Sequence, residues 1–363
     1  LAFDQGQNGK RFMSFIRQNA VVQSRLQAGA PAPVGVRGNS VPNVFRQILL
    51  PCLGLALAGP LAAAEFPSLQ KNLLAGDENG LPTDMPSMRI DSLWAVSPFN
   101  FVGALHIQSG GRTLYGTASA LSPHLVLTAG HNLDTDDNGV VDAGIEMSLA
   151  LPGYGSFTAS GFSLNPGFTG FGTSSIGSDL GLLYLDTPLP SNLSFPSLYS
   201  GLAEGDTVSL VGFGRSGYGN YGYTTEAGTT DRRVGMNVVD SFSVAGGGSG
   251  PNVFNYDFDA PDTLGQPGGS LGNNVETIIG PGDSGGPILF ALADGFGIAG
   301  VSTFTEGYGG RIGDIGGGVL IGPHLDWINS TLAIPEPSSL VLMLSGAVAL
   351  LCAARRARDR SMA

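Results

Sequence analysis

Three short segments of the chain carry the side chains that acyl transfer to water requires. A Thr-Ala-Gly-His segment ends at His131, an Asp-Leu-Gly-Leu-Leu segment begins at Asp179, and a Gly-Asp-Ser-Gly-Gly-Pro segment contains Ser284. This chemistry needs a hydroxyl nucleophile, an imidazole that takes its proton, and a carboxylate that fixes the imidazole tautomer. Each residue alone would be ordinary, but their joint occurrence favours a catalytic set. The other histidines lack such a context and are interpreted as structural: His106, His124 and His324.

Glycine beside the serine indicates a second part of the same chemistry. Gly282 and Ser284 can present two backbone N–H groups that converge on one point, as an oxyanion hole requires. A residue with a side chain at position 282 would distort such a tight turn. We therefore predict that the N–H groups of Gly282 and Ser284 form an oxyanion hole.

The elements that must position these residues are predicted to be short β-strands. Runs of β-branched, aliphatic and aromatic residues alternate with clusters of Gly, Pro, Asn and Ser, which is typical of an all-β sandwich or barrel. One short helix is expected over residues 324–332, where Leu325, Ile328 and Leu332 share a face. The expected strands are 101–107, 114–121, 125–128, 180–185, 207–212, 233–239, 287–292 and 297–303.

With its motifs in the order His, Asp, Ser, the chain resembles the trypsin/chymotrypsin family of serine proteases from Arg89 to Leu332. The resemblance implies an all-β, chymotrypsin-like double six-stranded β-barrel over residues 90–332, with the site between the barrels and a short C-terminal helix. It also implies that Ser284 is the nucleophile, His131 the general base and Asp179 its orienting carboxylate. The expected activity is endopeptidase hydrolysis of a protein or peptide substrate through an acyl-enzyme, with no cofactor for catalysis.

The alternative function is a catalytically idle, protease-like module displayed for adhesion or matrix binding. The intact His131, Asp179, Ser284 and Gly282 favour the enzyme, because an idle copy has no chemical reason to keep all four. One departure from the family pattern lies beside the histidine. Family members often have a disulfide-bonded cysteine there, and this chain has Asn132. We therefore expect the barrels to hold together without that disulfide.

The resemblance also places three residues in the primary specificity pocket. Ile278 stands at the wall position where cleavage after Lys or Arg requires a buried carboxylate, and an isoleucine cannot pair with a cation. Phe304 follows Ser302 in the family's Ser-x-Gly stretch and replaces a glycine that lines the pocket. We expect small or medium apolar residues before the scissile bond.

Asp283, directly before the nucleophile, bears on activation. In this family the acid accepts the new N-terminal ammonium of a cleaved proenzyme, because an unpaired buried carboxylate is costly. A cut between Arg89 and Ile90 would supply such an N-terminus and would make residues 65–89 a propeptide. The new end, Ile-Asp-Ser-Leu, lacks the usual Ile-Val-Gly-Gly. An internal arginine as partner of Asp283, in an enzyme active once exported, is therefore the alternative.

An acidic loop follows the histidine over residues 134–142. Its oxygen-bearing side chains at alternate positions and its turn at Gly139 match a calcium loop of the EF-hand type, although the closing acid, Glu146, is displaced by one position. An acidic turn that binds no ion is the alternative. The candidate ligands for a structural calcium are Asp134, Asp136, Asn138, the carbonyl of Val140, and Asp142.

The two ends of the chain are interpreted as sorting signals. Residues 1–64 hold a leader and a short apolar stretch that ends in small residues, which predicts an export signal peptide cleaved after Ala64. Residues 333–363 contain Pro-Glu-Pro, an apolar run over about 340–354 and an arginine cluster, which resembles a PEP-CTERM tail. That resemblance implies an exosortase-type processing enzyme as partner and transient anchoring in the inner membrane. The expected location is the periplasm, cell surface or extracellular matrix of a Gram-negative bacterium.

Composition excludes several other classes of protein. The 363 residues include 17 basic and 29 acidic side chains and carry a net charge of −12, which argues against nucleic acid because phosphate binding needs clustered Lys and Arg. The two cysteines, Cys52 and Cys352, lie near the ends, so the region between them holds no disulfide, thiol nucleophile or cysteine-ligated zinc. Glycine-rich residues 214–228 and 246–272 are predicted to be surface insertions.

Overall fold

The computed structural model describes residues 74–332 apart from 172–173, 247, 267 and 308. The predicted signal peptide and the sorting tail lie outside this range. The all-β prediction is confirmed, because the described chain consists of β-strands, short 3-10 turns and the short C-terminal helix α2 (Leu325–Leu332). Within the same residues, no helix has the length and apolar character needed to span a membrane.

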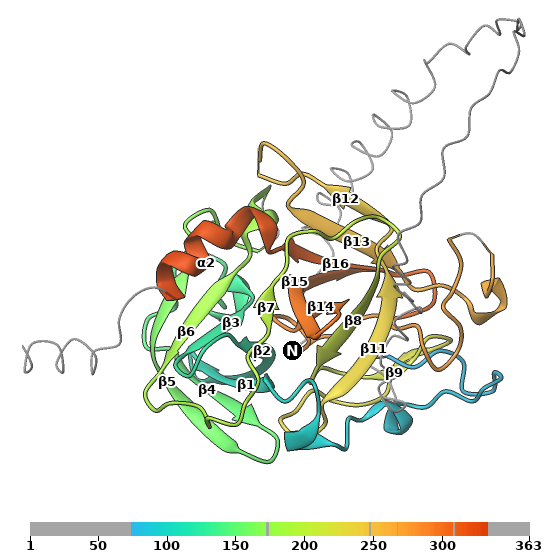
Figure 1. Ribbon diagram of the computed structural model, residues 1–363, viewed down its shortest axis with the longest axis horizontal. Helices are drawn as coiled ribbons and strands as arrows, with labels where there is room; N and C mark the ends of the chain where they lie inside the picture. Colours follow the sequence, from blue (N-terminus) through green and yellow to red (C-terminus); the bar gives the residue numbers. More distant parts are fainter. Residues whose placement is uncertain (1–73, 172–173, 247, 267, 308, 333–363) are drawn as a thin grey trace, which may run out of the picture. The chain divides into compact units, whose positions relative to one another are not determined.

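The first half forms a closed barrel in the strand order β1-β2-β3-β6-β5-β4 (Figure 1). All neighbouring strands are antiparallel, and closure leaves no unpaired strand edge. The strands are β1 (Val102–Ser109), β2 (Arg112–Ala120), β3 (Leu125–Thr128), β4 (Glu146–Leu151), β5 (Gly155–Leu164) and β6 (Gly181–Leu185).

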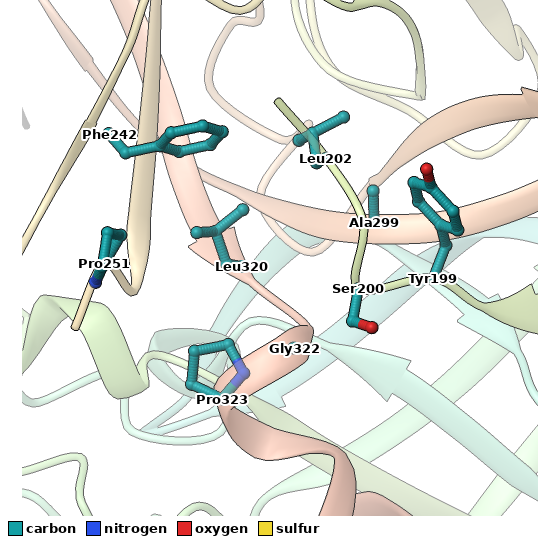
Figure 2. A pocket seen from close by; sticks show the side chains of 9 residues that line it. All are labelled: Tyr199, Ser200, Leu202, Phe242, Pro251, Ala299, Leu320, Gly322 and Pro323. Carbon is teal, nitrogen blue, oxygen red and sulfur yellow. The ribbon is translucent and has the colours of Figure 1, made fainter. Parts of the chain in front are cut away.

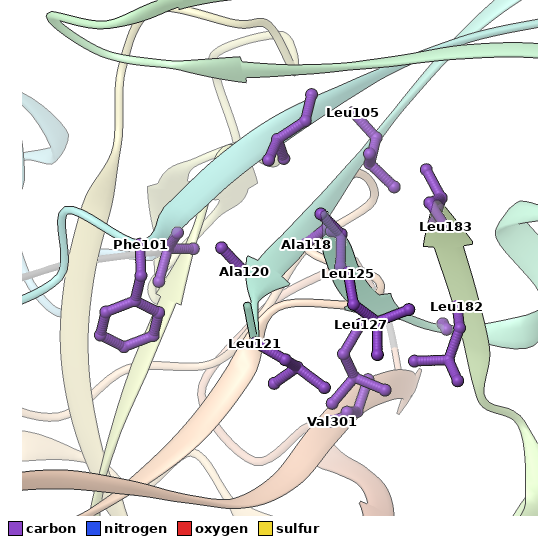
Figure 3. Close-up of a cluster of buried hydrophobic side chains, with 14 of the residues drawn as sticks. Phe101, Leu105, Ala118, Ala120, Leu121, Leu125, Leu127, Leu182, Leu183 and Val301 are labelled. Atoms are coloured by element: carbon purple, nitrogen blue, oxygen red, sulfur yellow. The ribbon is translucent and has the colours of Figure 1, made fainter. Parts of the chain in front are cut away.

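A hydrophobic core fills this barrel and continues into the second half of the molecule. Figure 3 shows Leu105, Leu127 and Leu182 as members of one cluster of buried side chains, to which Val301 is added from a strand of the second half. All four are at most 1% exposed, and each buried side chain of this size contributes about 1.5–3 kcal/mol relative to an exposed one. Ile328 of helix α2 belongs to the same cluster. The core therefore packs the two halves against each other.

The second half is one antiparallel sheet in the order β11-β8-β14-β15-β16-β13-β12, to which β7 adds a parallel pair with β15. In the described residues no ladder joins the end strands β11 and β12, so backbone pairing alone does not close this sheet into the second six-stranded barrel that the resemblance implies. The side-chain amide of Asn237 spans part of this gap, donating to the carbonyl oxygens of Asp257 at 2.7 Å and Thr277 at 2.8 Å. The strands are β7 (Ser197–Leu198), β8 (Thr207–Gly212), β11 (Arg233–Val238), β12 (Ser241–Ser243), β13 (Val253–Asp257), β14 (Pro287–Leu292), β15 (Gly295–Glu306) and β16 (Ile315–Leu320).

The remaining elements are short. Strands β9 and β10 pair with each other inside one of the two predicted surface insertions. Their bounds and those of the 3-10 turns are β9 (Gly217–Tyr218), β10 (Gly222–Tyr223), η1 (Pro86–Arg89), η2 (Trp94–Val96), η3 (Gly130–Asn132), η4 (Ser174–Ser178), η5 (Pro261–Thr263) and η6 (Gly322–His324).

The prediction of a surface insertion over residues 246–272 is wrong for β13. Phe254 and Tyr256 of that strand are 0% and 1% exposed and form part of a second hydrophobic core. Their rings lie against β16, where a Cβ added at Gly316 would meet the Tyr256 ring at 2.4 Å. Glycine in β16 is therefore required by the close approach of neighbouring side chains. Because glycine is not typical of strands, the sequence of β16 does not indicate a strand.

Residues 74–89, the described part of the predicted propeptide, are built into the second half. The N–H of Leu74 donates to the Thr277 hydroxyl oxygen at 2.9 Å, and Leu74 itself is fully buried. Asp84 and Arg89 are also fully buried and form an ion pair, and Arg89 Nη1 donates to the carbonyl of Glu276 at 3.3 Å. The segment thus contributes core contacts to the folded domain, and its removal as a propeptide stays a prediction.

Candidate active site

The register of the first barrel brings His131 and Asp179 together. His131 lies in η3, just after β3, and Asp179 lies just before β6, while Thr128 of β3 pairs with Gly181 of β6. Nδ1 of His131 is 2.7 Å from Oδ2 of Asp179, and the backbone N–H of His131 donates to Oδ1 of the same carboxylate at 2.8 Å. The aspartate therefore holds both the ring and the backbone of the histidine.

This contact sets the charge state and the tautomer of the imidazole. Burial by itself lowers the pKa of His131, but the charge and hydrogen bond of Asp179, aided by the charges of Asp137 and Asp134, outweigh burial and raise that pKa above its usual value. A carboxylate at Nδ1 requires the proton there, so the neutral ring keeps its lone pair on Nε2. The His131 side chain is 19% exposed and the Asp179 side chain is fully buried. The ring can therefore accept a proton from a group outside the core.

The loop of Ser284 is tied directly to the loop of the histidine. The carbonyl oxygen of Ser284 accepts hydrogen bonds from the N–H of Thr117 and from the side-chain amide of Asn132, each at 2.9 Å. Asn132 is the residue that follows His131. The Ser284 hydroxyl makes no hydrogen bond within the described part of the chain, and catalytic hydrogen bonds of this kind often tighten only when substrate binds.

The predicted oxyanion turn has the backbone conformation that glycine favours. Gly282 has a φ of +98°, and a Cβ at this position would lie 2.7 Å from the Cβ of Ala227. The hydroxyl of Thr117 donates to the carbonyl oxygen of Gly282 at 2.9 Å. Thr117 thus holds the carbonyl groups of both Gly282 and Ser284, which fixes the backbone that carries the predicted oxyanion donors.

Asp283 is held by backbone N–H groups. Its side chain accepts hydrogen bonds from Gly214 at 2.7 Å and from Gly280 at 2.8 Å, and the residue is 1% exposed. Burial raises the pKa of Asp283 to about 7, although these hydrogen bonds and the positive charge of Arg233 act in the opposite direction. Arg233 acts at a distance, since its own ion pair is with Asp231 at 3.3 Å. Within the described residues Asp283 forms no ion pair with an arginine, and its side chain is held by the backbone N–H groups of Gly214 and Gly280.

The three predicted pocket residues pack inward. Ile278 is fully buried in the second hydrophobic core, directly after the buried Thr277. Ser302 is 1% exposed, and its carbonyl oxygen accepts the N–H of Gly285 at 2.8 Å. Phe304 is 7% exposed, and a Cβ added at Gly317 would lie 2.5 Å from its ring. The Phe304 ring, which belongs to β15, therefore packs against the backbone of β16 at Gly317.

The acidic loop gathers three of the predicted calcium ligands. Ligand oxygens of Asp134, Asp136 and Asp142 all lie within 4.8 Å of one another. Desolvation and the charge of Asp142 raise the pKa of Asp136, as does the neighbouring Asp134. The Asn138 side chain instead accepts the N–H of Val140 at 3.0 Å. A cation would relieve the repulsion among the carboxylates, and calcium stays a prediction.

A pocket elsewhere on the second half contains none of the predicted site residues (Figure 2). The residues that line it come from the segment after β7, from β12 and the turn before β13, from β15, from the end of β16 and from η6. Among them are Tyr199, Phe242, Leu320 and Pro323.

Sequence reasoning missed the residues that join the two catalytic loops. Thr117 lies within a predicted strand that carries no motif, and Asn132 differs from the family pattern only in that it replaces a cysteine. Their hydrogen bonds to Gly282 and Ser284 join positions more than 150 residues apart. A single sequence offers no signal for such contacts.

A closed antiparallel barrel is packed on a second β-sheet, and the loop that follows the His-Asp pair is hydrogen-bonded to the Gly-Asp-Ser-Gly-Gly loop. This combination is that of a chymotrypsin-like serine protease. The Trypsin family model matches residues 96–328, more than half of the chain, so the protein belongs to the trypsin family of serine endopeptidases. No curated protein matches the chain.

Two solved structures are similar to the chain at low sequence identity. HL collagenase is 19% identical, with 65% of this chain and 95% of that chain covered and a TM-score of 0.47. A Glu endopeptidase in complex with MPD is 19% identical, with 65% and 92% covered and a TM-score of 0.43.

Proposed function

We propose that the protein is a secreted or surface-displayed serine endopeptidase in which Ser284, His131 and Asp179 form the catalytic triad. The observation that carries the proposal is the 2.7 Å contact between Asp179 and His131. It is supported by the hydrogen bond that ties the Ser284 loop to Asn132, the residue after the histidine. These contacts support a site that the three motifs share.

The chemistry follows from these positions. Nε2 of His131 takes the proton of the Ser284 hydroxyl as the oxygen attacks the peptide carbonyl carbon, and the N–H groups of Gly282 and Ser284 receive the developing oxyanion. His131 then gives the proton to the leaving amine, which leaves an acyl-enzyme. A water molecule, deprotonated by the same ring, hydrolyses this ester and restores the serine. Asp179 stays ionised throughout and stabilises the imidazolium.

The substrate class proposed is a polypeptide with a small or medium apolar residue before the scissile bond. The Phe304 ring over Gly317 supports this, because it occupies space that a large side chain would need. Ile278 supports it as well, since it supplies no charge for a Lys or Arg side chain.

We infer that the enzyme is active without a cut at Arg89. Asp283 has two backbone N–H donors, and the buried Arg89–Asp84 pair keeps the candidate cleavage site inside the fold. N-terminal sequencing of the active secreted form tests this. A start upstream of Leu74 in a fully active protein supports the inference, whereas a start at Ile90 contradicts it.

The sorting of the protein rests on its sequence alone. We propose export through the segment that ends at Ala64 and processing of residues 333–363 by an exosortase-type enzyme after transient anchoring in the inner membrane. The acidic loop from Asp134 to Asp142 is proposed to bind a structural calcium ion, supported by its three gathered carboxylates.

An idle adhesion module is the competing function. A fluorophosphonate probe separates the two, because it forms a covalent bond only with a serine that is activated by its base. Labelling of the wild type, with no labelling of Ser284→Ala or His131→Ala, supports the enzyme. Folded wild-type protein that neither takes up the probe nor hydrolyses casein supports the idle module.

A further inference from the structure

The position of Asp179 depends on a tight turn whose backbone carbonyl groups accept hydrogen bonds from residues outside the turn. Turn η4 ends immediately before Asp179, the N–H of Asp179 donates to the carbonyl of Ile176 at 3.2 Å, and the N–H of Leu180 donates to the carbonyl of Ser178 at 2.7 Å. The turn contains only five residues. Any shift of this turn therefore moves the carboxylate that orients His131.

Two residues distant in sequence hold the backbone on both sides of this aspartate. The N–H of Asn165 donates to the carbonyl of Leu180 at 3.0 Å, and Nε2 of His324 lies 2.8 Å from the carbonyl oxygen of Gly177. The side chains of the two holding residues also bond to each other, because Nδ2 of Asn165 lies 3.2 Å from Nδ1 of His324. Asp179 thus lies within a closed chain of hydrogen bonds.

The chemistry of these contacts defines the state of His324. A carbonyl oxygen only accepts, so Nε2 carries the proton. The Oδ1 atom of Asn165 accepts the N–H of Gly167 at 2.9 Å, which leaves its Nδ2 group as the donor to Nδ1 of His324. The ring is therefore neutral and uses both nitrogens. Burial lowers the pKa of His324, in agreement with a neutral ring.

We propose that His324 is a positioning residue for the catalytic Asp179, acting through the carbonyl of Gly177 with Asn165 as its partner. His324 belongs to η6, just before the C-terminal helix, so the end of the domain secures a loop of the first barrel. The inference rests on the proposed triad. Because misplacement of a catalytic group by about 1 Å can cost a factor of about 100 in rate, two hydrogen bonds on this short turn affect catalysis without touching substrate.

The test compares His324→Phe with a matched substitution, His124→Phe. Phenylalanine keeps the bulk of the ring and removes both hydrogen bonds. His124 is also partly buried, and its Nδ1 lies 2.9 Å from the carbonyl oxygen of Leu185, at the end of β6 away from Asp179. Peptide amide hydrolysis and thermal melting are measured for the wild type and both variants over a range of pH.

For His324→Phe we expect kcat to fall about 10- to 100-fold with KM changed less than about twofold. The acid limb of kcat/KM should move to lower pH, because Asp179 is what raises the pKa of His131. His324→Gln, which offers a donor and an acceptor, should recover part of kcat. His124→Phe should keep the wild-type kcat and acid limb.

A role confined to stability would lower the melting temperature of His324→Phe and leave kcat and the acid limb unchanged, and that result overturns the inference. If this variant does not fold, Asn165→Leu is used instead, because it removes the hydrogen bond between the Asn165 side chain and His324. An acid limb of kcat/KM that does not move in Asn165→Leu also contradicts the inference. If the wild-type protein shows no hydrolysis, or hydrolysis that Ser284→Ala leaves unchanged, the proposed function is overturned, and this inference with it.

Discussion

The side-chain amide of Asn132 donates to the carbonyl oxygen of Ser284 at 2.9 Å. The same amide nitrogen donates to the hydroxyl oxygen of Thr128 at 2.9 Å, and Asn132 is 6% exposed. Hydrogen bonds in such a buried setting are stronger than exposed ones. Asn132 follows His131 directly, at a position where trypsin-like proteases often have a disulfide-bonded cysteine. Polar contacts thus join the histidine and serine loops where this chain has no disulfide.

Asn132→Ala should lower kcat/KM by about 10- to 100-fold, because Ser284 loses one of the two donors that hold its carbonyl group. The rate of fluorophosphonate labelling should fall in parallel. Asn192→Ala is the control, since it removes an exposed side-chain amide that, in the described part of the chain, donates to the Tyr154 hydroxyl oxygen at 3.3 Å. Equal labelling rates in the wild type and Asn132→Ala would contradict a role for this contact.

The activity should decline on the acid side through a group whose pKa lies above that of an ordinary histidine. The raised pKa of His131 reflects stabilisation of its cation by Asp179, so the neutral base is lost as pH falls through that raised value. Asp179→Asn should move the acid limb to lower pH and reduce kcat by about four orders of magnitude. The profile of kcat/KM against pH measures both effects. An acid limb that stays in place in Asp179→Asn would exclude His131 as the titrating base.

Phe304→Gly should widen the range of residues accepted before the scissile bond. Removal of the ring opens space over Gly317, so peptide amides with Leu or Phe at this position should gain in kcat/KM relative to those with Ala. One methylene group more or fewer in an apolar pocket changes the discrimination between two substrates by about 10- to 200-fold. Rapid hydrolysis of arginyl amides by the wild type would contradict the proposed pocket.

Removal of calcium should lower the melting temperature. An ion that binds only the folded state adds RT ln(1 + [L]/Kd) of stability, about 2.7 kcal/mol at a free concentration of 100 Kd. Asp136→Asn removes an exposed carboxylate of the loop, and chelation should then have a smaller effect on melting. Equal melting temperatures of the wild type with and without chelator would exclude a structural ion.

The fold could be predicted in part: four strands of the first barrel, β1, β2, β3 and β6, were expected from the sequence, whereas β4 and β5 were not. Strand β3 is buried along its whole length and appears in the sequence as a continuous apolar run before His131. Strand β13 and the glycine-rich strand β16 were not predicted, since their burial depends on the rings of Tyr256 and Phe304 lying against glycine. Local composition does not record such contacts.

The catalytic motifs were predictable because each combines a reactive side chain with its own strand end or turn. Their supports were not, because Asn132 and His324 act through hydrogen bonds to carbonyl groups of Ser284 and Gly177. Any residue can offer a carbonyl, so these contacts leave no trace in residue identity. The buried position of Arg89 was hidden for the same reason, since it depends on Asp84 and on the backbone of the second half.

The most direct test of the triad measures casein hydrolysis and fluorophosphonate labelling of the wild type beside Ser284→Ala and His131→Ala. If Ser284 and His131 act as proposed, the wild type is active and labelled, and both variants lose several orders of magnitude in activity. Melting temperatures close to that of the wild type would show that both variants keep the fold. Wild-type activity or labelling in Ser284→Ala would contradict the assignment of the nucleophile.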